Sequence, residues 1–139
     1  MPSPDVLEVI ALRSSRAYQD AETLRRKKFG GSKGLKNIKV KENTKEYSAL
    51  RLLIGTWEAI GHRILGLPEP ERVAFYQTNP IGFMWRLLKP AVEHIRKEAG
   101  KQEYAKNFEE VAYAYDAWLK TQPHEYQTGA ASGIIALCG

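Results

Sequence analysis

The segment that decides the fold spans residues 43 to 66 and reads NTKEYSALRLLIGTWEAIGHRILG. Its apolar residues recur every three or four positions, the spacing that places them on one face of an α-helix. Asn43 followed three residues later by Glu46 is typical of a helix start, and Gly66 is typical of a helix end. We therefore expect an amphipathic helix whose buried face consists of Leu50, Leu53, Ile54, Trp57, Gly61 and Ile64.

Four further helices are expected around this one. Ser3-Pro4-Asp5 begins a helix that should reach about Lys28, where a glycine-rich turn ends it. A short helix follows Pro68, and the next helix contains Pro90, which should bend or split it. A last helix is expected from about residue 103 to residue 120. The fold class is thus all-α, an irregular bundle of four to six helices with a long N-terminal helix and a basic loop.

The length and composition are those of one folded domain. The chain has 139 residues, of which 43% are hydrophobic, which is enough to bury a core. We expect a single helical domain over residues 1–122, with a basic loop inserted at 29–43. A C-terminal tail over 123–139 either packs on the bundle or frays.

Other segments of the sequence exclude several protein classes. Cys138 is the one cysteine, so neither an internal disulfide framework nor a multi-cysteine zinc site is expected. The first residues lack the pattern of a secretory signal, and no apolar run approaches the ~20 residues of a membrane span. We expect a cytoplasmic protein with no membrane contact.

The net charge of +5 comes from one segment. Residues 25 to 45 hold nine basic side chains and one acidic one, so this segment carries +8 and the remainder carries −3. Lysine and arginine neutralise phosphates and release counterions, which makes the segment a candidate nucleic-acid contact. The alternative is a solvated loop or a contact for an acidic protein face, because charge alone does not identify a partner. Phe29 is the one aromatic residue in this segment, so the sequence gives little support for base stacking there.

The last expected helix carries aromatic residues on more than one face, namely Tyr113, Tyr115 and Trp118. A helix that is apolar on several faces is typical of one that contacts a partner beyond its own bundle. We therefore expect a homodimer or a protein target, with Trp118 as an exposed anchor. The candidate partner-binding residues are Arg25, Arg26, Lys27, Lys28, Lys33, Lys36, Lys39, Lys41, Tyr113 and Trp118.

Catalytic and metal-binding patterns are weak. Glu58 with His62, and His94 with Glu98, are spaced to share a helical face, but the spacing differs from the Glu-x-x-His pattern of di-metal bundles. Such pairs are usually surface interactions. The glycines at 30–34 lack the spacing of a phosphate-binding loop. We expect neither an enzyme nor a bound metal or cofactor.

Residues 47–118 resemble the domain-of-unknown-function 4760 family of small bacterial helical proteins. The resemblance rests on the helix from Leu50 to Leu65, on Trp85 and Pro90 five positions apart, on Arg96, and on Phe108-Glu109-Glu110. It implies a helical fold and a bacterial or mobile-element origin, and it supplies no catalytic residues. Members of the family often carry N-terminal membrane helices, whereas an amphipathic helix and a basic loop are expected here.

These observations predict a non-enzymatic protein-binding module. One setting that suits it is a mobile-element or phage accessory protein that inhibits a bacterial defence complex, such as a CRISPR effector, by surface occupancy. The alternative is a nucleic-acid-binding protein that uses the basic segment 25–45.

Overall fold

The computed structural model describes residues 4–36, 41 and 43–123, and all regular structure in them is helical. This confirms the all-α class. The described part contains more helices than the four to six expected, because the N-terminal helix is broken and a short helix lies within the basic loop. The helices are α1 (Pro4–Ser14), α2 (Arg16–Lys28), α3 (Ser32–Leu35), α4 (Lys45–Leu65), α5 (Glu69–Thr78), α6 (Ile81–Ala99) and α7 (Lys106–Lys120). The expected tail, from residue 124 onward, lies outside the described residues.

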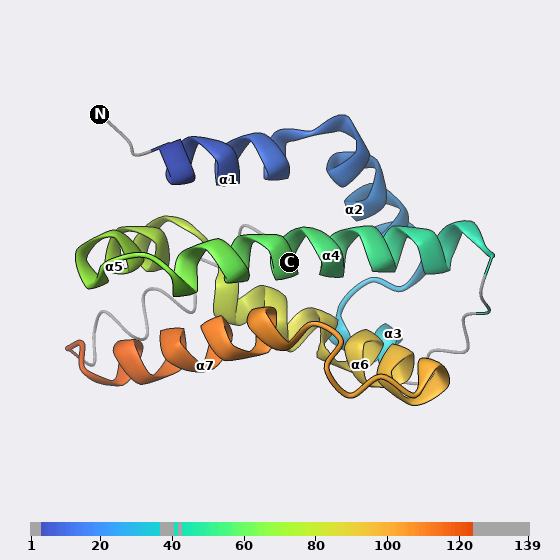
Figure 1. Cartoon of the computed structure of the whole chain (residues 1–139). Helices are drawn as coiled ribbons and strands as arrows, with labels where there is room; N and C mark the ends of the chain where they lie inside the picture. Colours follow the sequence, from blue (N-terminus) through green and yellow to red (C-terminus); the bar gives the residue numbers. More distant parts are fainter. Residues whose placement is uncertain (1–3, 37–40, 42, 124–139) are drawn as a thin grey trace.

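Helix α4 is the centre of the arrangement (Figure 1). α1 and α2 lie along one side of it, and α6 and α7 lie along the other. α4 also contacts α5, so five other helices pack against it. The face predicted to be buried is confirmed, since all six of its residues are buried.

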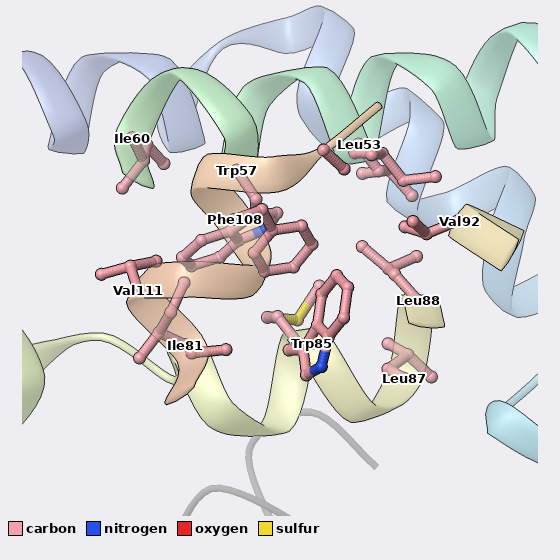
Figure 2. Packing of buried hydrophobic residues seen from close by; sticks show 14 of the residues in the cluster. Leu53, Trp57, Ile60, Ile81, Trp85, Leu87, Leu88, Val92, Phe108 and Val111 are labelled. Carbon is pink, nitrogen blue, oxygen red and sulfur yellow. The ribbon is translucent and has the colours of Figure 1, made fainter. Parts of the chain in front are cut away.

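The core is built around the ring of Phe108 in α7 (Figure 2). Trp57 of α4 stacks on this ring with the centroids 6.0 Å apart and the planes inclined by 20°. Trp85 of α6 meets the same ring edge-on, with a centroid distance of 5.1 Å. Such aromatic pairs contribute about 0.5–1.5 kcal/mol beyond the area they bury. One side chain therefore joins three helices.

The N-terminal region differs from the single long helix expected for it. Ser15 has extended backbone (φ −62°, ψ 148°), and its hydroxyl accepts the N–H of Tyr18 at 3.1 Å. A serine in this conformation begins a new helix, so the region forms α1 and α2. The break also directs Tyr18 toward the core, where its hydroxyl accepts the indole N–H of Trp57 at 2.9 Å.

Helix boundaries elsewhere are close to those expected. Thr44, one residue after the expected Asn43, is the N-cap of α4, and its hydroxyl accepts the N–H of Tyr47 at 3.2 Å. α6 continues through Pro90 as one helix, so the split that Pro90 was expected to cause does not occur. Gly100 ends α6 in the left-handed conformation (φ 64°). These positions follow local sequence signals to within a few residues.

Gly61 sets how closely α4 approaches α7. A Cβ there would lie 2.8 Å from the carbonyl oxygen of Asn107, a backbone atom that cannot rotate away. We expect Gly61→Ala to lower the free energy of unfolding by about 1–3 kcal/mol, because the two helices must separate. Urea unfolding followed by circular dichroism measures this change.

Gly55 provides the matched control on the same helix. A Cβ there meets nothing within 4 Å, so Gly55→Ala should raise the free energy of unfolding by up to about 1 kcal/mol through helix propensity alone. Equal stability of the two variants would contradict the close approach at Gly61.

Candidate anion-binding site

The described part of the basic segment is anchored to the bundle. Its first four residues form the last turn of α2, and its glycine-rich turn leads into α3. Leu35, the last residue of α3, is completely buried in the core. α3 packs against α6, and Figure 1 shows it beside that helix. Lys36 follows Leu35 directly and is therefore held near α6.

Lys36 and α6 together line a pocket of about 490 Å³. Its lining includes four cationic side chains and one carboxylate, with a proline and a histidine between them. Because like charges gather here with few acids to balance them, the pocket favours an anion. The lining residues are Lys36, Arg86, Lys89, Pro90, Glu93, His94 and Lys97.

The amphipathic pattern of α6 explains why its cations share the pocket. Leu88, Val92 and Ile95 are buried in the core, so the opposite face of the helix carries the charged positions. Lys89 lies 4.0 Å from the carboxylate of Glu93, and both side chains are about half exposed. An exposed pair of this kind is strongly screened by solvent, so Lys89 can still contact a bound anion.

Arg25 lies in the interior of the protein, although it was expected at the binding surface. It is only 2% exposed, and two of its guanidinium nitrogens lie 2.9 and 3.1 Å from the Glu22 carboxylate. A third nitrogen donates to the carbonyl oxygen of Gly30. Arg25 therefore holds the turn between α2 and α3 in place, which positions α3 and Lys36.

The other basic residues of the segment lie at the surface. Arg26 is 3.6 Å from Glu22, and Lys28 is 4.0 Å from Glu46. Lys27, Lys33 and Lys41 are exposed, and Lys39 lies outside the described residues. Among the described residues of the segment, Lys36 is the one that lines the pocket.

The two aromatic candidates of α7 lie in different surroundings. Tyr113 is 53% exposed and touches Trp85 edge-on at 6.5 Å between centroids. Trp118 is half-buried and packs against Tyr76 and Tyr115, at 5.5 and 6.0 Å between centroids. Trp118 thus contributes to packing within the chain, and neither residue lines the cationic pocket.

The acid–base candidates serve structural roles or are dispersed. The Glu58 carboxylate accepts the backbone N–H groups of Asn107 and Phe108, at 3.2 and 2.9 Å, and so caps the first turn of α7. Burial raises the pKa of Tyr104 to about 12, further from neutrality than the ordinary value for a tyrosine. Within the described residues, no three side chains that ligate metals come together.

Comparisons with protein-family models, with curated proteins and with solved structures returned no match. The resemblance to the domain-of-unknown-function 4760 family therefore stays a prediction. None of the described helices combines the length and the apolar character needed to cross a bilayer.

Sequence reasoning missed the three cations of α6 that line the pocket, which are Arg86, Lys89 and Lys97. They belong to the part of the chain that carries a net negative charge, so a count of charge by segment concealed them. The signal that could have found them is their position on the polar face of a strongly amphipathic helix.

The buried position of Arg25 has a testable consequence for stability. We expect Arg25→Ala to lower the free energy of unfolding by about 3 kcal/mol, because Glu22 would lose the closer of the two arginines that contact it, which is also the buried one. Arg26→Ala is the control, since Arg26 contacts the same carboxylate but is 58% exposed, and should change stability by less than about 0.5 kcal/mol. Chemical denaturation compares the two, and equal effects would contradict the structural role of Arg25.

Proposed function

We propose that the protein is a non-enzymatic binding protein that holds nucleic acid by its phosphate backbone. The observation that carries this proposal is the meeting of Lys36 with Arg86, Lys89 and Lys97 around one pocket. Guanidinium and ammonium groups form short, charge-assisted hydrogen bonds to phosphate oxygens. Lys36, which follows α3, and the cations of α6 could contact neighbouring phosphates on one nucleic-acid strand or on both strands of a duplex.

The surroundings of the pocket support the same function. Lys33 lies on α3 and is exposed, so the short helix directly before Lys36 carries a second cation. Release of counterions from a polyanion would supply most of the binding free energy, and affinity would then fall steeply with salt. This mode of binding needs no catalytic residues.

The salt dependence of binding tests the proposal. With four phosphate contacts, the slope of log affinity against log salt should be about −3.6 on duplex DNA. We expect the double variant Arg86→Ala/Lys89→Ala to reduce the slope by about 1.8 and to weaken binding roughly 50-fold at 0.1 M salt. Fluorescence anisotropy with a labelled mixed-sequence DNA of about 20 nucleotides, single-stranded and duplex, measures both quantities.

The matched control removes the same charges elsewhere. Arg16→Ala/Lys120→Ala also deletes one arginine and one lysine, and neither residue lines the pocket. Its salt slope should stay close to that of the unmodified protein. Absence of DNA binding by the unmodified protein, or equal slopes for the two double variants, would argue against the proposal.

A second candidate function is protein binding, the role that the sequence favoured. Leu7 and Ile10 are 54% and 53% exposed and lie one turn apart on α1, while Val9 on the other side is buried. Neighbouring exposed apolar side chains lose contact with water when a partner covers them, which favours association. A homodimer, or an inhibitor of a bacterial defence complex that acts by surface occupancy, could use this face.

The mass in solution tests the homodimer. If α1 forms the interface, the unmodified protein should elute with the mass of two chains in light scattering, and Leu7→Glu/Ile10→Glu should elute with the mass of one. Both side chains are exposed, so the variant should unfold within about 0.5 kcal/mol of the original. A single-chain mass for the unmodified protein at high concentration would exclude the homodimer.

A further inference from the structure

Among the residues that the structure describes, the lining of the cationic pocket contains no Phe, Tyr or Trp ring. His94 is the one aromatic ring among the described lining residues; it is half-buried and already interacts within the protein. At the described lining residues, a bound nucleic acid would therefore meet cations but no exposed Phe, Tyr or Trp ring on which a base could stack.

The aromatic ring that adjoins Arg86 in the sequence faces the core. Trp85 precedes Arg86 directly, yet it is 4% exposed and its ring packs on Phe108. Figure 2 shows Trp85 and Phe108 together inside the bundle. Among the described Phe, Tyr and Trp residues, Tyr113 is the one that is exposed. It lies on α7, outside the pocket lining.

We infer that this pocket binds double-stranded nucleic acid in preference to single strands, and does so without regard to base sequence. The inference rests on the proposed function. Single-strand binders gain about 1–3 kcal/mol for each base stacked on an aromatic ring. Without stacking, the charge density of the polymer decides the affinity, and a duplex carries one charge per ~1.7 Å of its axis.

The spacing of the cations suits a duplex backbone. Arg86 and Lys97 lie eleven positions apart on α6, about 16 Å along the helix axis. Over that length a duplex presents roughly nine phosphates on its two strands. A rigid helix that carries cations along this length, with Lys36 supplied by another element, finds a phosphate within reach of each cation whatever the bases are.

The experiment compares a mixed-sequence DNA duplex of about 20 base pairs with one of its own strands, between about 50 and 200 mM salt. The expected slopes of log affinity against log salt are about −3.6 for the duplex and about −2.8 for the single strand. The duplex should then bind roughly fivefold more tightly at 0.1 M salt. A second duplex of different sequence should bind with the same affinity to within about twofold.

The variant Tyr113→Ala separates binding through charge from binding through base stacking on an exposed aromatic ring. If the pocket acts through charge alone, this variant binds both forms of DNA as the original does; its thermal unfolding by circular dichroism confirms that it is folded. Equal or tighter binding of the single strand, loss of single-strand binding in Tyr113→Ala, or a strong dependence on duplex sequence would each overturn the inference and leave the proposed function intact. Failure to bind either form would overturn the proposed function itself.

Discussion

The stacking of Trp57 on Phe108 is the contact on which the rest of the structure depends, because it fixes where α4 and α7 cross. Two other features act at the same crossing. Gly61 lets the backbones approach, and the Glu58 carboxylate accepts two N–H groups from the start of α7. Trp57 also donates to Tyr18, so the same side chain ties α2 to the crossing.

The cationic pocket follows from this core. Trp85 packs against Phe108, which fixes the rotation of α6 about its own axis. With Leu88 and Val92 turned inward, the opposite face of α6 points outward, and it carries Arg86, Lys89 and Lys97. Leu35 then adds α3 to the same helix, and Lys36 completes the set. The apolar interior thus determines the position of each charge at the surface.

The local pattern of the sequence was enough to predict α4, α5, α6 and α7, because burial of one helical face repeats at a short, readable spacing. It did not predict the break at Ser15, because the two-helix arrangement is supported by the distant contact between Tyr18 and Trp57. Arg25 was assigned to the surface because a charged side chain is normally solvated; its burial depends on Glu22 and on the Gly30 carbonyl. The pocket brings Lys36 together with residues far along the chain. A local sequence pattern could not predict it, because such a pattern relates only residues that are close in the sequence.

The cap of α7 has a consequence for how the protein folds. Ala105, at the N-cap position, has no side chain that could accept a hydrogen bond, and the acceptor that replaces it is Glu58, 50 residues earlier than Phe108. A peptide of α7 alone would therefore lack its cap and would be a poor helix in water. The helical structure of α7 and its docking on α4 should therefore form in a single cooperative step. A fragment that ends before α7 would lose both that helix and its packing against α4.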